Sequence, residues 1–233
     1  MSILVNLKRE LKLKADPERA KILQGFFKTG KGEYGEGDIF LGLVAPKIRE
    51  IALKYKNLKL GDLQKLLKSK IHEERVAALR ILVDKFQKSG EMERKKIFNF
   101  YLKNAKRVNN WDLVDLSAPK IVGEYLLNKN RKILYKLVKS KNIWERRIAV
   151  LATFAFIDKN EFNDSLKIAE ILLKDKHDLI HKAVGWMLRE MGKKSQKSLE
   201  DFLKKHFRKM PRTMLRYSIE KLSETKRKMW LKK

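Results

Sequence analysis

The sequence predicts an all-α protein made of stacked helical pairs. Apolar residues recur at intervals of three and four positions along nearly the whole chain, which is the period of an amphipathic helix. The alternation of apolar and polar residues that marks a strand is absent over any useful length. Similar segments also recur at a spacing of about 36 residues, close to that of known helical-pair repeats. We therefore expect a single α-helical repeat domain over residues 1–233.

Short links separate the helices that this pattern predicts. The expected helices cover residues 3–14, 17–28, 46–55, 62–68, 73–87, 92–106, 111–127, 131–138, 143–157, 161–173, 178–191, 195–207 and 211–222. Proline stands in the first turn of three of them, where its missing amide hydrogen is not needed. Pro119 falls inside the expected helix 111–127 and predicts a kink or a split there. Residues 224–233 are expected to form a basic tail.

Two short segments reveal the internal repeat. Ser69–Arg75 resembles Ser140–Arg146, and their starts are 71 positions apart (140 − 69 = 71), or about two periods. Steps of one period from Arg75 reach Trp111 and then Arg147, each near the start of an expected helix. Equivalent positions of stacked repeats face the same side of the array. The repeat therefore predicts that Trp111 and Arg147 lie on one inner surface.

Candidate functional side chains lie around these two positions. Asp115 is one turn after Trp111 on the same helix face. Asp112 stands at the helix start, where an acidic residue also has a purely structural role against the helix dipole. Arg147 suits a backbone phosphate through its planar guanidinium, and a salt bridge to a neighbouring helix is the alternative.

A later segment adds a second tryptophan. One further period reaches Ala183, and Trp186 follows about one turn later, with Arg189 on the same face. Gly185 favours close helix packing, so a core position for Trp186 is the alternative. His177 and His181 have the spacing of metal ligands, but no third ligand stands out. We expect no metal and no cofactor.

Charge and composition narrow the class of partner. The chain holds 56 Lys and Arg against 28 Asp and Glu, a net charge of +28. Such an excess favours an anionic partner, with nucleic acid before a membrane surface, and a solvated lysine-rich exterior is the alternative. No apolar run is long enough to cross a bilayer, and no secretory signal is recognisable. The absence of cysteine excludes disulfides, thiolate zinc sites and cysteine nucleophiles, and fits a cytoplasmic protein.

A glycine-rich segment at residues 29–38 interrupts the helical pattern. It lacks the spacing of a phosphate-binding Walker loop, and no strand precedes it. A long flexible connection is the favoured interpretation. A loop that touches a DNA backbone is the alternative.

These motifs together resemble the DNA alkylation repair glycosylases of the AlkD type, over about Gly25 to Arg189. The resemblance rests on Trp111-Asp112-x-x-Asp115, Trp144-x-x-Arg147 and Lys182-Ala183-x-Gly185-Trp186-x-Leu188-Arg189-Glu190. It implies HEAT-like helical pairs stacked into a curved solenoid, with a basic concave face for duplex DNA. It also implies hydrolysis of the N-glycosidic bond of alkylated purines such as N3-methyladenine and N7-methylguanine, without base flipping.

The resemblance also implies roles for single residues. Asp115 corresponds to the catalytic aspartate of the family, and Trp111 and Trp186 correspond to its two lesion-side tryptophans. The residues expected to contact DNA are Arg147, Arg189, Phe26, Lys28 and Lys182. Phe26 stands where a relative has tyrosine, so a hydroxyl is missing, and the glycine-rich loop after it is longer than in that relative.

The leading hypothesis is thus a monomeric DNA glycosylase for cationic alkylated purines. Its partner is double-stranded DNA containing alkylated bases, and its expected location is the cytoplasm, on the nucleoid. A non-catalytic DNA- or RNA-binding scaffold is the first alternative, because basic helical repeats often only bind. A protein–protein adaptor is the second. It predicts exposed apolar patches and binding that depends little on salt, whereas nucleic-acid binding weakens steeply with salt.

Overall fold

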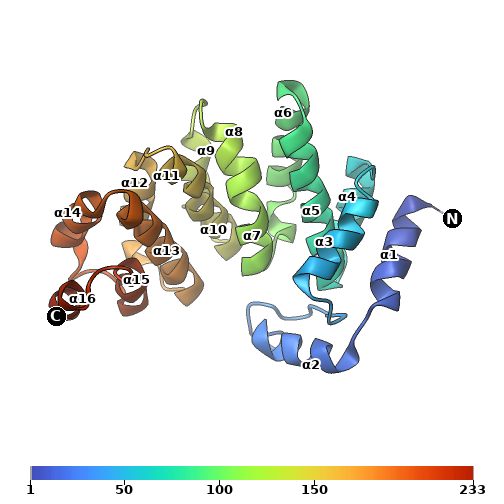
Figure 1. Cartoon of the computed structure of the whole chain (residues 1–233), viewed down its shortest axis with the longest axis horizontal. Coiled ribbons are helices and arrows are strands. Elements are labelled where there is room, and N and C mark those ends of the chain that lie inside the picture. Colours follow the sequence, from blue (N-terminus) through green and yellow to red (C-terminus); the bar gives the residue numbers. More distant parts are fainter. Residues whose placement is uncertain (1, 233) are drawn as a thin grey trace. The chain divides into compact units, whose positions relative to one another are not determined.

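The computed structural model describes residues 2–232, in which the regular elements are helices joined by short links and by one longer non-helical segment at residues 27–44 (Figure 1). Among the described residues the one β-type contact is an isolated bridge between Ile39 and Ile71. The all-α prediction is therefore confirmed. The chain divides into two compact units, Met1–Ser117 and Ala118–Lys233, and each is described by itself. The expectation of one repeat domain stays a prediction.

The first unit is built around α5. Its helices are α1 (Ile3–Leu13), α2 (Pro17–Phe26), α3 (Ala45–Lys54), α4 (Leu60–Leu67), α5 (His72–Lys88), α6 (Glu91–Lys103), the short 3₁₀ helix η1 (Ala105–Arg107) and α7 (Trp111–Ala118), whose last residue lies past the unit boundary. Both α3 and α4 pack on α5. Most of α5 is buried, including Leu79, Ile81 and Leu82, so it forms the core of this unit. By contrast, α2 contains no buried residue.

The second unit is built around α13. Its helices are the π-helix η2 (Pro119–Gly123), α8 (Glu124–Leu126), α9 (Lys132–Leu137), α10 (Ile143–Ala152), α11 (Phe154–Asp158), α12 (Asn163–Ile171), the 3₁₀ helix η3 (Leu172–Lys174), α13 (Asp178–Lys194), α14 (Gln196–His206), α15 (Arg212–Ser218) and α16 (Glu224–Leu231). The most extensive contact between two helices is that of α13 with α15. A Cβ atom at Gly185 would lie 2.5 Å from Cβ of Tyr217 and 2.6 Å from the carbonyl oxygen of Met214. Only glycine lets these two helices approach so closely, as the sequence predicts.

The predicted internal repeat recurs as a pair of matching hydrogen bonds. In the first unit, Nη1 of Arg75 donates to the carbonyl oxygen of Ser69 at 2.8 Å. In the second unit, Nη1 of Arg146 donates to the carbonyl oxygen of Ser140 at 2.9 Å. Each serine hydroxyl also accepts from the amide two residues later, at 3.1 Å and 3.0 Å. The offset of 71 positions found in the sequence is therefore a repeat of local structure as well.

Two helices end where the three- and four-residue periodicity alone would continue them. The expected split at Pro119 is confirmed, because α7 ends at Ala118 and a π-helical turn follows. The expected helix 143–157 is broken at Thr153, whose hydroxyl donates to the carbonyl oxygen of Val150 at 2.7 Å. Hydrogen bonds of this kind bend helices, so a single β-branched residue divides one predicted helix into two.

The expectation of a basic tail at residues 224–233 is wrong. Glu224–Leu231 form α16, and the hydroxyl of Ser223 accepts from the amide of Lys226 to cap it. The ring of Trp230 is buried and lies 5.4 Å from the ring of Phe207. This aromatic contact anchors a segment whose many lysines look solvated in the sequence.

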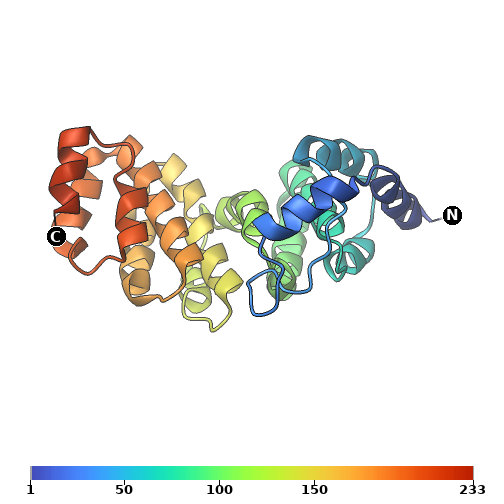
Figure 2. The same cartoon turned by 90° about the horizontal axis from the view of Figure 1, so that it is seen from below.

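The glycine-rich segment is tied down at both ends rather than a free connection (Figure 2). The amide of Gly35 donates to the carbonyl oxygen of Lys28 at 3.0 Å, and Ile39 exchanges backbone hydrogen bonds with α5 and the residues before it. The carboxylate of Glu73 then accepts from three consecutive amides, at residues 41 to 43. Gly42 has a φ of +90°, and a Cβ there would lie 2.1 Å from the carbonyl oxygen of Asp16, so glycine is required.

Candidate functional site

Trp111 stands at the first position of α7 in a cluster of aromatic rings. Its indole stacks on Phe27, with ring centres 5.1 Å apart and planes 14° apart. Phe26 meets the same indole edge-on at 5.8 Å. Phe27 in turn stacks on Phe40 at 5.0 Å, and Phe40 stacks on His72 at 4.5 Å. This aromatic column fixes the orientation of a tryptophan that remains half-buried.

A buried ionic cluster lies at the other end of the column. Nε2 of His72 is 2.7 Å from Oδ2 of Asp112, and Nδ1 is 3.5 Å from Oδ2 of Asp38. Nη2 of Arg75 donates to the same Asp38 oxygen at 2.5 Å. These contacts join the end of the glycine-rich loop to α5 and to the residue that follows Trp111. The cluster therefore links the start of α7, where Trp111 stands, to the end of the glycine-rich loop and to α5.

His72 is the titratable member of this cluster. Only 2% of its surface is exposed, and burial alone would lower the pKa of the imidazole. The negative charge of Asp112 and the hydrogen bonds to Asp112 and Asp38 act in the opposite direction and raise the pKa of His72 above its ordinary value. The folded protein therefore favours the protonated imidazole.

A cavity of about 280 Å³ lies beneath α2 in the first unit. Its walls come from α2, α3, α5, α7 and the segment after α2. They include Phe26, Phe27, Phe40, His72, Arg80 and Asp112. Aromatic and charged side chains thus meet beside the start of α7.

Asp115 lies one helical turn after Trp111 and is half-buried. The hydroxyl of Tyr101 hydrogen-bonds to that of Ser117 at 2.9 Å. Burial raises the pKa of Tyr101 most, and the charge of Asp115 raises it further. The negative charge of the Asp115 carboxylate is therefore felt by the buried hydroxyl of Tyr101.

The predicted residues of the second unit are held by hydrogen bonds. Arg147 is only 4% exposed, and its Nη1 donates to the carbonyl oxygen of Leu179 at 2.6 Å. Nζ of Lys182 forms an ion pair with Oδ2 of Asp178 at 2.8 Å. Nearly complete burial of Arg147 is not evident in the sequence, where it follows two charged residues.

Glu190 binds the two other predicted side chains of α13, Trp186 and Arg189. Its carboxylate accepts from Nε1 of Trp186 at 3.1 Å and from Nε of Arg189 at 3.4 Å. Arg189 also forms an ion pair with Glu220. Burial would raise the pKa of Glu190, but the hydrogen bond and charge of Lys193, with those of Trp186 and Arg189, hold it below its usual value. Trp186 and Arg189 therefore share one face, as predicted.

The structure thus brings together some of the predicted residues. Phe26 and Trp111 touch in the first unit. Lys28, two residues after Phe26, is exposed and has a left-handed backbone at φ 52°. Trp186 and Arg189 meet in the second unit. The predicted common surface draws on both units and stays a prediction. The aromatic column and the ionic cluster also contain Phe27, Phe40 and Asp38, which no motif in the sequence indicates. Their other members, His72 and Arg75, belong to the repeat segment Ser69–Arg75, which does not mark them as site residues.

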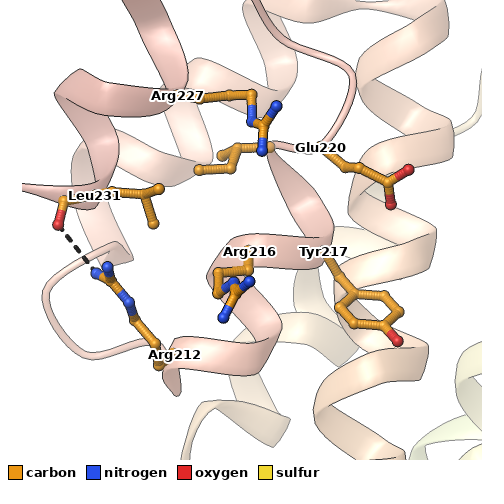
Figure 3. A pocket seen from close by; sticks show the side chains of 7 residues that line it. Arg212, Arg216, Tyr217, Glu220, Arg227 and Leu231 are labelled. Carbon is orange, nitrogen blue, oxygen red and sulfur yellow. Dashed lines mark hydrogen bonds between the residues drawn. The ribbon is translucent and has the colours of Figure 1, made fainter. Parts of the chain in front are cut away.

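A basic cavity of about 310 Å³ lies in the second unit (Figure 3). Arg212 and Arg216 approach it from α15, and Arg227 approaches it from α16. Arg212 also donates to the carbonyl oxygen of Leu231 at 3.0 Å. All three arginines are exposed, so they form a solvated cationic patch.

Residues 2–232 offer neither a candidate metal site nor a candidate membrane-spanning helix. Residues 2–232 contain no group of three or more His, Asp and Glu placed to hold a metal ion. Within the same range, none of the helices is long and apolar enough to span a bilayer.

The chain is similar to one protein family and to several solved structures. The chain matches the family model described as DNA alkylation repair enzyme over residues 7–222. A solved structure described as a predicted DNA alkylation repair enzyme from Enterococcus faecalis has a TM-score of 0.71 at 18% identity, covering 90% of this chain and 97% of that one. AlkD2 from Streptococcus mutans has a TM-score of 0.56 at 18% identity, covering 95% and 100%.

A third structure, smu.31 from Streptococcus mutans UA159, has a TM-score of 0.53 at 19% identity, covering 93% and 96%. No curated protein matches the sequence. Identities this low show a shared fold, whereas the family model spans nearly the whole chain. The chain therefore belongs to the DNA alkylation repair enzyme family.

Proposed function

We propose that the protein is a DNA glycosylase that hydrolyses the N-glycosidic bond of positively charged alkylated purines in duplex DNA. N3-methyladenine and N7-methylguanine are the proposed substrates. The observation that carries the proposal is the pairing of Asp115 with Trp111 on one face of α7, where the aromatic column fixes the indole. Family membership supplies the setting of DNA alkylation repair.

The reaction needs little acid catalysis, because an N-alkylated purine already carries the positive charge of a good leaving group. As the bond between C1′ and the purine nitrogen breaks, its electron pair neutralises the purine and positive charge develops on the sugar. The Asp115 carboxylate stabilises that charge and accepts the proton of the water that attacks C1′. Trp111 and Trp186 present the negative faces of their rings, each contributing about 0.5–2 kcal/mol toward a nearby cation.

Contacts to the DNA backbone complete the proposal. Arg147, Arg189, Lys28 and Lys182 are assigned to phosphates, and Phe26 is assigned to the nucleotide beside Trp111. Phosphate contacts fix the register of a protein on a duplex without reading its sequence. We assign the protein to the backbone side of the lesion, with the damaged base left stacked, because Trp111 and Asp115 share one half-buried face of α7.

Product identification tests this function. A duplex carrying one N7-methylguanine is incubated with the protein, and the free base and the abasic strand are quantified by mass spectrometry against spontaneous loss. We expect both products in equal amounts, formed faster than without protein. If the duplex binds but no base is released above the spontaneous rate, this substrate assignment fails, and a non-catalytic DNA-binding scaffold becomes the better account.

A further inference from the structure

Two arginines of the first unit have no counter-ion. Arg80 lies on α5 and is half-buried, and its Nε is inaccessible to water and has no hydrogen-bond partner. Arg49 lies on α3, and no ion pair or hydrogen bond joins either side chain to another described residue. Elsewhere the pattern differs, because the half-buried Arg131 and Arg146 and the buried Arg75 are all bound to carboxylates. Among these buried and half-buried arginines, Arg80 is therefore the exception.

The electrostatic environment of Arg80 is unfavourable in the free protein. Burial lowers the pKa of its guanidinium most, and the like charge of Arg49 lowers it further, against a smaller opposite effect of Asp112. Taking a cation out of water beside another cation destabilises it unless an anion arrives. The two guanidinium groups thus mark a place where an anion would be stabilised.

A cavity of about 440 Å³ lies along α3 beside Arg80 of α5. Its lining consists of Ala45, Pro46, Arg49, Glu50, Leu53 and Arg80. The carboxylate of Glu50 is already taken, because it lies 2.8 Å from Nζ of Lys47 and 3.3 Å from Nζ of Lys54. The volume equals roughly fifteen times the share of one water molecule in the liquid, which is ample for a hydrated phosphate group.

The site adjoins the proposed reaction centre. Arg80 also lines the cavity beneath α2, whose wall includes Asp112, the residue after Trp111. The N-terminus of α3 borders the same cavity, and the side chain of Val44 does not cap the first amides of that helix. The partial positive charge of this helix end adds to that of the two arginines.

We propose that Arg49 and Arg80 bind one backbone phosphate of duplex DNA, beside the nucleotide that Trp111 contacts. The inference rests on DNA as the partner in the proposed function. Paired guanidinium groups match the oxygens of a phosphate through their parallel N–H donors. The cavity of Figure 3 is a weaker candidate, because water screens the charges of all three of its exposed arginines, whereas Arg80 is half-buried.

Binding of an undamaged duplex tests the proposal without any excision. Affinity is measured across a series of salt concentrations for the wild type, Arg80→Met and Arg49→Ala. Methionine keeps an unbranched apolar stem and removes the guanidinium group with its charge and its N–H donors. We expect each variant to bind about tenfold more weakly near 0.1 M salt, and the slope of log K against log salt to become shallower by about 1.

Lys95→Met is the matched control, because Lys95 is exposed on α6, no ion pair or hydrogen bond joins it to another described residue, and the substitution removes the same charge. It should change affinity by less than about threefold. Equal slopes for the wild type, Arg80→Met and Arg49→Ala would overturn the proposal. Because the duplex is undamaged, a failure to release alkylated bases would remove the proposed function and leave this result standing.

Thermal unfolding separates a ligand site from a structural arginine. The unfolding temperature of free Arg80→Met should equal or exceed that of the wild type, because an unpaired charge is lost. A clear decrease in unfolding temperature would assign Arg80 to the core and overturn its role as a ligand residue. The duplex affinity of Arg49→Ala would then be the remaining test of the site. Inorganic phosphate at constant ionic strength distinguishes the source. If it stabilises the wild type but not Arg80→Met while duplex affinities stay equal, the site binds free phosphate and the backbone assignment is wrong.

Discussion

Arg75 and Arg146 occupy equivalent repeat positions in the two units. They make the same local hydrogen bond but bind carboxylates from different parts of the chain. Both guanidinium groups hold the carbonyl oxygen of a serine six residues earlier. Their carboxylate partners differ. Arg75 binds Asp38 at the end of the glycine-rich loop, whereas Arg146 binds Asp175 just before α13.

The neighbouring repeat position differs more in chemistry. His72 begins α5, and Ile143 begins α10 at the equivalent position. Only the first unit therefore has a titratable group at this point, in contact with the acidic residue beside Trp111. The difference indicates that the repeat supplies the helical frame, while single substitutions within it create a titratable network beside Trp111 in one unit and an apolar contact in the other.

Removal of the two equivalent arginines should give the largest difference between the units. Arg75→Met leaves the buried Asp38 without its closest cation, and we expect a loss of about 3–5 kcal/mol in unfolding free energy. Arg146→Met should cost about 2 kcal/mol, because Asp175 still accepts from the amide of His177 at 2.9 Å. Chemical denaturation of both variants checks this order. Equal losses would mean that the two clusters are energetically equivalent despite their different burial.

The His72 contact should make the first unit sensitive to pH. Because the pKa of His72 is raised in the folded state, its protonated form is favoured there. That stabilisation is complete below the ordinary pKa of 6.5 and is lost as pH rises through the raised value. Relative to His72→Gln, the wild type should therefore be more stable at pH 6 than at pH 9. A stability difference that is independent of pH would contradict a titrating His72.

Phe26→Ala should have the smallest effect on stability. Phe26 is 62% exposed, so its removal should cost less than about 1 kcal/mol, whereas loss of the buried Phe27 ring should cost about 3–5 kcal/mol. Under the proposed function, Phe26→Ala should still slow base release, because its ring flanks Trp111. Thermal unfolding and single-turnover release on the same preparations make the comparison. A destabilisation as large as that of Phe27→Ala would place Phe26 in the core instead.

Local periodicity was sufficient to predict the frame from the sequence. Three- and four-residue spacing identified nearly all helices, and the serine-to-arginine segments located the repeat because both make the same local bonds. Gly185 was interpretable for the same reason, since close helix packing leaves room for no other residue. The break at Thr153 depended on one side-chain hydrogen bond, which periodicity does not register.

The composition of the candidate site depends on contacts that are distant in the sequence. Asp38 and Asp112 approach His72 from 34 positions before it and 40 positions after it. No spacing rule connects such residues. The stack of Phe27 and Phe40 likewise exists only because the loop between them returns to α5. The motif residues Trp111 and Asp115 were recognisable because they lie one turn apart on one helix.

The central claim is that Asp115, and not its neighbour Asp112, is the catalytic carboxylate of α7. Single-turnover release of N7-methylguanine from a duplex tests it with Asp115→Asn beside Asp112→Asn, at protein concentrations that saturate binding. The account predicts a loss of at least about 100-fold for Asp115→Asn with duplex affinity retained, and less than about tenfold for Asp112→Asn, whose amide oxygen still accepts from His72. Release by Asp115→Asn at the wild-type rate, or a larger loss for Asp112→Asn, would contradict it.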